Sequence, residues 1–337
     1  MKYFTSVHDV KEPWKLVSQA LEIKQNPFAF PHLGKNKTLG LIFLNPSTRT
    51  RLSTQKAGLN LGMNVIVMNA DKDGWALELE DGAVMNGTSV EHVKDAARVI
   101  GRYCDIVGIR CFPNLKDKKE DYSEKVLLAF MKHCKVPVVS MESATLHPLQ
   151  SLADMMTITE NWKLKRKPKI VLMWAPHIKP LPQAVANSFA EWSLKLSYPL
   201  TIAHPEGYDL CADFSSGAQI THSQTQALED ADFVYVKNWS SFSDYGKIIG
   251  DHSQWLLTNV KMKITNNAKL MHCLPVRRNV EVPDELLDNA NSLIYRQAEN
   301  RVFAAQAVLK NLLESPFVKK QEAVSHEAGA SAFAKFS

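Results

Sequence analysis

The alternation of short apolar, β-branched runs with helical patterns is the feature that most limits how this chain can fold. The first half carries four predicted strands, 38–44, 65–69, 105–110 and 136–141, with helices near 47–62, 90–103 and 121–134. The second half repeats the alternation, with predicted strands at 169–174, 200–204, 233–237, 269–273 and 292–295. Strands joined by helices pair in parallel, and helices then cover both faces of the sheet. The sequence therefore predicts an α/β protein with two doubly wound parallel sheets.

A chain of 337 residues exceeds what one hydrophobic core usually supports, so two domains are expected. The first predicted domain spans 1–150 and the second 151–297, and a helix that begins after His147 would cross from one to the other. A last helix, 298–315, could pack back onto the first domain. Residues 316–337 have no apolar period and are rich in small residues, so we expect a disordered tail there.

The composition is that of an ordinary globular protein, with 45% hydrophobic and 22% charged residues. The net charge of +5 suits a small anionic ligand, and the lysine-rich runs at 116–119 and 163–169 are typical of solvated loops rather than of a basic stripe for nucleic acid. The N-terminus has no apolar signal-peptide core, and no apolar run reaches the length of a membrane span. We therefore expect a cytoplasmic protein without nucleic-acid or membrane partners.

Several metal and cofactor motifs are missing from the sequence. The five cysteines are an odd number without C-x-x-C spacing, which argues against a disulfide framework and a structural zinc site. No G-x-G-x-x-G follows a predicted strand, and neither G-x-x-x-x-G-K-[ST] nor H-E-x-x-H occurs. The expected chemistry uses neither a metal nor a cofactor.

The segment LIFLNPSTRT, at 41–50, predicts a phosphate-binding site. An apolar strand stops at a proline, and Ser47 can cap the helix that follows. The first turn of a helix has unpaired N–H groups and the positive end of the helix dipole, so it favours a dianion. Ser47, Thr48 and Thr50 add hydroxyl donors. Arg49 adds a planar fork for phosphate oxygens, although these residues alone fit an ordinary capped helix with a surface arginine equally well.

Further polar residues follow the other predicted strands, and ligands of open parallel sheets bind beyond the carboxyl ends of strands. The residues in these positions are Arg110, Glu142, His147, Gln150, His177, Lys237 and the run from Cys273 to Arg278. Most of them are cationic or form hydrogen bonds, which suits a multiply charged anionic substrate.

Four motifs occur in the order and approximate spacing of the transcarbamylases, which this chain resembles over roughly residues 1–315. They are Ser47-Thr-Arg-Thr50, His147-Pro-Leu-Gln150, His272-Cys-Leu-Pro275 with Arg278, and Glu299-Asn-Arg301. The resemblance implies the transcarbamylase fold and the transfer of a carbamoyl group from carbamoyl phosphate to an amine. It also implies a homotrimer whose active sites lie between subunits.

The resemblance assigns a set of residues to carbamoyl phosphate: Ser47, Thr48, Arg49, Thr50, Trp75, Arg110, His147, Gln150, Cys273, Leu274 and Arg301. The expected catalytic residues among them are Thr50, Arg110, His147, Gln150 and Cys273. The carbonyl oxygen gains charge as the amine attacks, and donors such as Arg110 and His147 can stabilise it. The carbamoyl NH2 needs acceptors, which Gln150 and the backbone carbonyls of Cys273 and Leu274 can supply. Taken singly, the histidine fits a residue that starts a helix, the cysteine a small buried side chain and the helical arginine a surface residue.

The segment after the predicted strand 233–237 departs from the ornithine members of the family. Those members carry Asp-x-x-x-Ser-Met-Gly, whose aspartate meets the α-ammonium of ornithine, whereas this chain continues from Lys237 with Asn-Trp-Ser-Ser. Lys237 would repel an α-ammonium and favour a carboxylate. With the proline-rich segment 174–182, it resembles the branch that carbamoylates N-acylated ornithine, in which the α-amine has no charge. In that branch a proline-rich loop surrounds a threaded segment, so we expect a knotted chain.

The resemblance also assigns residues to the acylornithine: Glu142, His177, Lys237, Arg278 and Val90. Acetyl-specific relatives have a glutamate at the position of Val90, and that glutamate would repel the terminal carboxylate of a succinyl group. N-succinylornithine is therefore the expected amine, with N-acetylornithine, ornithine and a catalytically silent, metabolite-binding role as alternatives; Val90 could also simply pack against a helix start. The resemblance places Trp75 in the active site of a neighbouring subunit, with 71–90 as a lid.

Overall fold

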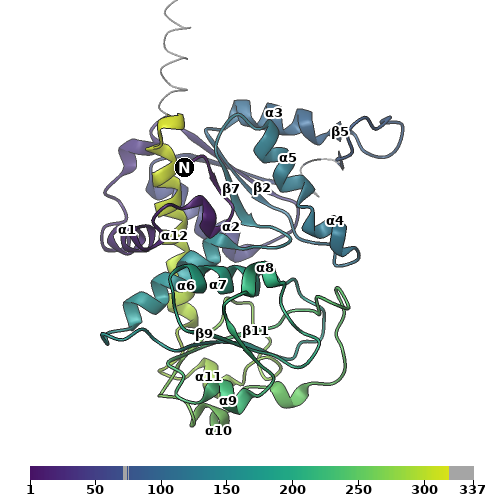
Figure 1. The fold of residues 1–337 in the computed structure, drawn as a ribbon. Coiled ribbons are helices and arrows are strands. Elements are labelled where there is room, and N and C mark those ends of the chain that lie inside the picture. Colours follow the sequence, from purple (N-terminus) through teal and green to yellow (C-terminus); the bar gives the residue numbers. More distant parts are fainter. Residues whose placement is uncertain (71–73, 75, 319–337) are drawn as a thin grey trace, which may run out of the picture.

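Two five-stranded parallel sheets organise the chain (Figure 1). The computed structural model describes residues 1–70, 74 and 76–318. The first sheet, in the order β1-β7-β6-β2-β3, consists of β1 (Tyr3–Phe4), β2 (Thr38–Phe43), β3 (Asn64–Asn69), β6 (Ile106–Arg110) and β7 (Val138–Glu142). The second, in the order β10-β9-β8-β11-β12, consists of β8 (Ile170–Trp174), β9 (Leu200–Ala203), β10 (Gln219–Thr221), β11 (Phe233–Lys237) and β12 (Lys269–Met271). All of these pairings are parallel, so the predicted α/β architecture with parallel sheets is confirmed.

Helices connect the strands. Those that accompany the first sheet are α1 (Pro13–Gln25), α2 (Thr48–Asn60), α3 (Val93–Tyr103), α4 (Lys118–Tyr122) and α5 (Lys125–His133). The later ones are α6 (Pro148–Asn161), α7 (Ala184–Lys195), α8 (Ala212–Ser215), α9 (Gln224–Leu228), α10 (Asn259–Met262), α11 (Asp284–Leu287) and α12 (Ile294–Leu313). Short 3-10 turns lie at Val7–Asp9, Pro31–Gly34 and Ser253–Trp255, and β4 (Leu77–Glu78) pairs with β5 (Glu91–His92) apart from both sheets.

The first sheet is apolar on both faces, as expected of parallel strands that helices cover on two sides. Along β2, Leu39, Leu41 and Phe43 belong to the core that α1, α2 and α12 share. Ile42, which points to the opposite face, belongs to a separate cluster with α3 and α5. Figure 1 shows these two groups of helices on opposite sides of the sheet.

Each sheet has one place where the direction of strand addition reverses. In the first sheet the chain adds β3 beyond β2 and then returns to add β6 and β7 on the other side of β2. In the second it adds β9 and β10 beyond β8 and then returns to β11 and β12. The loops after the neighbouring strands diverge at such a point and leave a crevice at their carboxyl ends.

Two helices join the halves of the molecule. The helix α6 leaves the first sheet after β7, is buried from 148 to 158 and packs against α7. The last helix, α12, returns to pack against α1, α2 and α6 (Figure 1). Residues 316–318 follow it, with Val318 buried, and the remainder of the predicted tail lies outside the described residues.

A second contact between the halves lies on the side away from α12, where α4 meets the loop after β11 (Figure 1). The Tyr245 hydroxyl donates a hydrogen bond to Asp121 Oδ2 over 2.8 Å. The next residue, Gly246, has a φ of 72°, and a Cβ there would lie 2.1 Å from the Leu115 carbonyl oxygen. Only glycine allows this approach, because any side chain would meet backbone and adopt an unfavourable conformation.

Some expected elements differ from the structure. The predicted strand at 292–295 is wrong, because Ser292 forms only an isolated bridge with Leu270 and α12 begins at Ile294, four residues before its predicted start. The apolar pair 293–294 is buried in either arrangement, so its hydrophobicity did not distinguish strand from helix. The helix predicted at 121–134 is two helices, α4 and α5, separated at Glu124 with a φ of 49°. The strands β1 and β10 were not predicted, since two or three residues carry no period.

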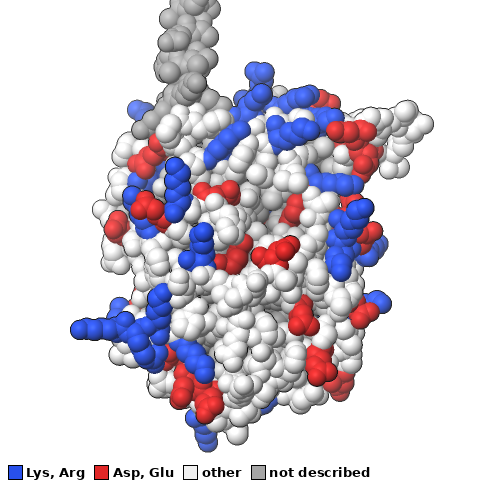
Figure 2. All heavy atoms as spheres, in the orientation of Figure 1, with Lys and Arg blue, Asp and Glu red and all other residues white. Residues whose placement is uncertain are grey.

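No helix in the described ranges is long and apolar enough to cross a bilayer. All five cysteine thiols are free and buried. In the same part of the chain, no group of three His, Cys, Asp or Glu side chains could hold a metal ion. On the face drawn in Figure 2, basic and acidic side chains are interspersed over both halves of the molecule.

Candidate active site between the two sheets

A cleft of about 690 Å³ lies between the two halves, at the carboxyl ends of β2, β6, β7, β11 and β12. The sequence-predicted residues that line it are Ser47, Thr48, Arg49, Thr50, Arg110, Glu142, His147, Gln150, His177, Lys237, Cys273, Leu274 and Arg301. Its cationic side chains are Arg49, Arg110, Lys179, Lys237, Arg277 and Arg301, against two acids, Glu142 and Glu281. The excess of cations favours anionic ligands.

One end of the cleft is the N-terminus of α2. Ser47 is the N-cap in an extended conformation, and its hydroxyl accepts a hydrogen bond from the Thr50 N–H over 3.4 Å. The N–H groups of Thr48 and Arg49 form no hydrogen bond with the described residues, as expected in a first helical turn. Together with the Arg49 guanidinium they are the donors for which the sequence predicts an anion-binding site.

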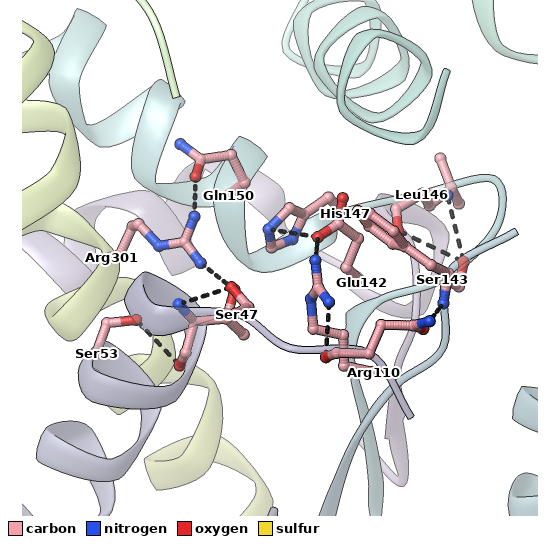
Figure 3. Close-up of polar contacts among 12 residues, drawn as sticks. Ser47, Ser53, Arg110, Glu142, Ser143, Leu146, His147, Gln150 and Arg301 are labelled. Carbon is pink, nitrogen blue, oxygen red and sulfur yellow. Dashed lines mark hydrogen bonds and ion pairs between the residues drawn. The ribbon is translucent and has the colours of Figure 1, made fainter. Parts of the chain in front are cut away.

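Arg110 ends β6 and is held from two sides (Figure 3). Its Nη1 donates to the carbonyl oxygens of Asn45 and Pro46 over 2.8 and 3.0 Å, and its Nη2 donates to Glu142 Oε2 over 3.0 Å. The register of β6 against β7 shifts by one residue after Ile109, which brings Arg110 opposite Glu142. Both side chains are buried, and burial raises the pKa of the Glu142 carboxyl although the guanidinium groups of Arg110 and Arg301 act in the opposite direction.

His147 is the residue before α6, and its ring is buried in the same cluster. Its Nε2 lies 3.6 Å from Glu142 Oε2, while its Nδ1 has no hydrogen-bond partner within the described chain. Burial, with the positive charges of Arg301 and Arg110 as further causes, lowers the pKa of His147 well below its usual value. The imidazole is therefore neutral at pH 7 and can donate a hydrogen bond from one nitrogen only.

A buried hydrogen-bonded chain crosses from α2 to α6 through α12 (Figure 3). Arg301, on α12, donates from Nη2 to Thr50 Oγ1 over 2.7 Å and from Nη1 to Gln150 Oε1. Arg301 is only 6% exposed, so the other interpretation of this residue, a solvated surface arginine, is wrong. Three residues that are distant in sequence thus meet at one point of the cleft.

The loop after β12 forms another wall of the cleft. Leu274 has a φ of 56°, and its N–H donates to His272 Nδ1 over 2.9 Å. Burial raises the pKa of the Cys273 thiol, which stays protonated and is a poor nucleophile. A role for this loop through its backbone carbonyls is therefore better supported than thiolate chemistry.

The far end of the cleft, beyond β11, contains basic residues around one buried carboxylate. Glu281 accepts the Arg277 N–H over 2.8 Å on Oε1 and approaches His272 Nε2 to 3.2 Å on Oε2. His177 Nε2 accepts a hydrogen bond from Arg277 Nε over 3.2 Å. Lys237, at the end of β11, is buried and lines the cleft.

Arg278 is placed differently from the sequence-based expectation. Its guanidinium lies outside the cleft lining and is held by Asp284 over 2.8 Å and by Asp288 over 2.8 and 2.9 Å. Arg277 faces the cleft in its place. The Arg-Arg pair was visible in the sequence, but which member faces inward depends on the loop conformation.

One other expected residue, Val90, does not line the cleft of this chain. Val90 is 64% exposed, and its N–H donates to the Ala76 carbonyl over 3.0 Å, beside the β4–β5 pair. Trp75 lies outside the described residues. Sequence reasoning also missed Lys179 and Glu281, which line the cleft; both follow recognisable motifs by a few residues, which was the only available signal.

The fold and the cleft define a class of protein: an α/β protein whose interdomain cleft combines a helix N-terminus with an excess of cationic side chains, an arrangement suited to group transfer from a phosphorylated compound. Residues 2–160 match the aspartate/ornithine carbamoyltransferase carbamoyl-P binding domain, and residues 182–312 match the Asp/Orn binding domain of the same enzymes. The chain belongs to the aspartate/ornithine carbamoyltransferase family. The prediction of a carbamoyltransferase is thereby confirmed.

Two individual relatives and one solved structure show which members of the family this chain is similar to. An N-succinylornithine carbamoyltransferase of Bacteroides fragilis is 47% identical over 94% of this chain and 99% of its own length. An N-acetylornithine carbamoyltransferase of Xanthomonas campestris is 35% identical over 93% of this chain and 98% of its own. Among solved structures, an N-acetyl-L-ornithine transcarbamylase variant with a glutamate replaced by valine, complexed with carbamyl phosphate and N-succinyl-L-norvaline, has a TM-score of 0.86 at 35% identity and covers 93% of this chain and 100% of its own.

Proposed function

We propose that this protein transfers the carbamoyl group of carbamoyl phosphate to the δ-amine of N2-succinyl-L-ornithine, giving N-succinylcitrulline and phosphate in arginine biosynthesis. The observation that carries the proposal is Lys237, a buried cation in the cleft whose ammonium forms no hydrogen bond or ion pair with the described residues. A buried charge is costly without a partner, and a substrate carboxylate would supply one. The α-ammonium of free ornithine would be repelled, whereas an acylated α-amine is neutral.

Carbamoyl phosphate would bind at the α2 end of the cleft. Its phosphate would meet the first-turn N–H groups, the Ser47 hydroxyl and Arg49. Thr50, Arg110 and His147 are the proposed donors to the carbonyl oxygen, and each is worth about 3–4 kcal/mol where such donors stabilise a developing oxyanion. Gln150 and the backbone carbonyls of the 273–274 loop would accept hydrogen bonds from the carbamoyl NH2, and Trp75 of a neighbouring subunit would close the site.

The δ-amine must lose a proton to attack. With a lysine-like pKa, its neutral form costs about 4–5 kcal/mol at pH 7. His147 is neutral and could accept a proton, but it is proposed here as a donor to the carbonyl, so the departing phosphate is the proposed proton acceptor. A pH-rate and solvent-isotope study in which His147→Asn removed a titrating base would contradict this assignment.

The acyl group would be recognised at the basic end of the cleft and across a subunit boundary. Glu142, His177 and Lys237 line the cleft and remain proposed contacts of the acylornithine, with Arg277 in the place first expected for Arg278. Val90 would act from a neighbouring subunit of a homotrimer, on a lid formed by 71–90; its 64% exposure in the single chain is compatible with that role.

The domain boundaries, the doubly wound sheets and the knot are part of the same proposal. Residues 1–150 with 298–315 would form the carbamoyl phosphate domain and 151–297 the acylornithine domain, both doubly wound. The proline-rich loop at 174–182 would surround a threaded segment and make the chain knotted. Five free thiols fit a reducing cytoplasm.

Turnover of N-succinylornithine, N-acetylornithine and ornithine by the native chain tests the amine. We expect the succinyl compound to have the highest kcat/KM. Val90→Glu should lower that value at least about tenfold relative to the acetyl compound, equivalent to roughly 1.4 kcal/mol of like-charge repulsion. Val84→Glu, which adds the same charge to a still more exposed position of the segment, should leave the preference unchanged. If both the native chain and Val90→Glu prefer the acetyl compound, the proposal that an uncharged residue 90 selects the succinyl group is wrong.

Three alternatives have distinct outcomes in the same assay. N-acetylornithine, or free ornithine, would be the substrate if it had the highest kcat/KM. A catalytically silent, metabolite-binding protein would bind carbamoyl phosphate yet transfer label from it to none of the three amines. The cationic residues retained in the cleft favour a working enzyme.

A further inference from the structure

Asp154 is a buried carboxylate on α6, one helical turn beyond Gln150, and its residue is fully inaccessible to solvent. Its Oδ1 accepts two hydrogen bonds, from Gln150 Nε2 and from Gln297 Nε2, both over 2.7 Å. Its Oδ2 has no hydrogen-bond partner within the described residues. Asp154 does not line the cleft, so it would not touch a substrate there.

Each of the two glutamines uses its other end for a part of the site. Gln150 Oε1 accepts the hydrogen bond from Arg301 Nη1, and Gln297 Oε1 accepts the His272 N–H over 2.9 Å. An amide can present either its oxygen or its NH2 group in the same volume, so the partners decide the orientation. An acceptor at Asp154 requires both NH2 groups to face it and both amide oxygens to face away.

These contacts link two elements that both line the cleft. Gln150 comes from the first turn of α6, and His272 begins the loop that carries Cys273 and Leu274. The buried Tyr235 lies in the same surroundings: burial, with the nearby Asp154 carboxyl group as a further cause, raises the pKa of its hydroxyl well above the usual value. Burial raises the pKa of Asp154 itself to about 7, against the lowering effect of its hydrogen bonds from Gln150 and Gln297. In either protonation state an oxygen remains to accept both hydrogen bonds, so a single carboxyl group is connected to both sets of atoms that the proposed function assigns to the carbamoyl NH2.

We propose that Asp154 is a positioning residue for carbamoyl transfer: through Gln150 and Gln297 it orients the acceptors that hold the carbamoyl NH2. The inference rests on the proposed function, because it takes from it the role of Gln150 and of the loop carbonyls. Two hydrogen bonds on one oxygen explain why an acceptor is required at 154. The effect should appear mainly in the chemical step, because Asp154 and its two glutamines have no direct hydrogen bond to Ser47 or Arg49. The link to the phosphate end runs only through Arg301 and Thr50.

The test compares Asp154→Ala and Asp154→Asn, with N-succinylornithine turnover for kcat and calorimetry for binding of carbamoyl phosphate. Asp154→Ala should lower kcat about 100-fold and change the Kd by less than fivefold. Asp154→Asn keeps an oxygen that accepts both hydrogen bonds, so it should recover kcat to within about tenfold of the native chain. An alanine variant with kcat within threefold of native, or an asparagine variant as slow as alanine, would overturn the proposal.

If Asp154→Ala fails to fold, a second variant tests the connection from Asp154 through Gln297 to His272. Gln297→Met keeps the volume but removes the bond to His272, and it should lower kcat about tenfold without loss of carbamoyl phosphate binding; an unchanged kcat would overturn the link. The matched control is Thr157→Val, which breaks a buried bond from Asn300 on α12 to α6 outside the network and should leave kcat unchanged. A native chain that transfers to no amine would contradict the proposed function, whereas an active native chain with an unimpaired Asp154→Ala would contradict only the role of Asp154.

Discussion

At the residue scale, the pair Arg110 and Glu142 shows how the protein stabilises a buried guanidinium in the cleft, by placing a carboxylate beside it. Arg110 uses two nitrogens for fixed protein partners, and its Nε has none among the described residues. Buried polar atoms are usually satisfied, so a missing partner is typical of a place where a ligand or water binds. The guanidinium is oriented before a substrate arrives.

We predict that Arg110→Gln lowers kcat roughly 10²–10³-fold, because a shorter neutral side chain cannot stabilise the developing oxyanion. This decrease corresponds to a loss of about 3–4 kcal/mol of transition-state stabilisation. It also leaves Glu142 buried without its cation, which should cost about 3–5 kcal/mol of folding stability. Steady-state kinetics and thermal melts measure the two effects. The double variant Arg110→Gln with Glu142→Gln should regain stability but not activity; recovery of activity would show that the charge of Arg110 is dispensable.

At the scale of elements, the turn between β7 and α6 carries Glu142 at one end and His147 at the other. A single carboxylate from the start of α5 fastens it: Glu124 Oε1 accepts from the Ser143 hydroxyl over 2.6 Å, the Thr145 N–H over 2.9 Å and the Thr145 hydroxyl over 2.6 Å. Glu124 does so from a left-handed backbone with a φ of 49°, which is unfavourable for a residue with a side chain. The position of two site residues thus depends on a residue outside the cleft.

Glu124→Ala should therefore lower the free energy of unfolding by about 2–4 kcal/mol, because four hydrogen bonds of the turn are lost, the fourth being the long bond from the Ala144 N–H to Oε2. It should also raise KM, since Glu142 and His147 lose their fixed positions. Glu124→Gly removes the same carboxylate but relieves about 1 kcal/mol of backbone cost, so it should be the more stable of the two with the same KM defect. Denaturant titration with kinetics measures both; equal KM for both variants and the native chain would show that the turn needs no clamp.

At the scale of the whole molecule, the first and second halves are joined by polar contacts as well as by α6 and α12. One of them is Glu191, on α7, whose Oε1 accepts the Val7 N–H over 3.2 Å. His8 Nε2 lies 3.9 Å from its other oxygen. Burial, only partly offset by the Val7 hydrogen bond and strengthened by the charge of Asp9, raises the pKa of Glu191 from 4.5 to about 7.

This raised pKa predicts a pH-dependent stability. The folded chain binds a proton that the unfolded chain releases between pH 4.5 and 7, so the contribution is fully present below pH 4.5 and is lost as the pH rises through 7. Between pH 5 and 8, Glu191→Gln should gain up to about 3 kcal/mol of stability relative to the native chain. Thermal melts across this range measure the difference. Glu206→Gln, at an exposed position, is the control, and a native profile parallel to that of Glu191→Gln would refute the shift.

The sequence by itself determined the parallel α/β architecture and the capped helix start that follows β2. Both depend on local physics: a run such as 38–43 is buried on two faces and must be apolar throughout, and a proline followed by a capping serine starts a helix wherever it lies. The ordered motifs added the family, because four short patterns rarely occur together in one order.

Only the tertiary structure decided which side chains meet. It placed Arg277 in the cleft and tied Arg278 to Asp284 and Asp288, a choice set by the loop conformation that neighbouring arginines cannot reveal in sequence. It also brought Asp154 between Gln150 and Gln297, across 143 residues, because α12 returns to pack on α6. Hydrophobic period and capping act over a few residues, whereas a hydrogen bond between distant helices exists only once the chain has packed.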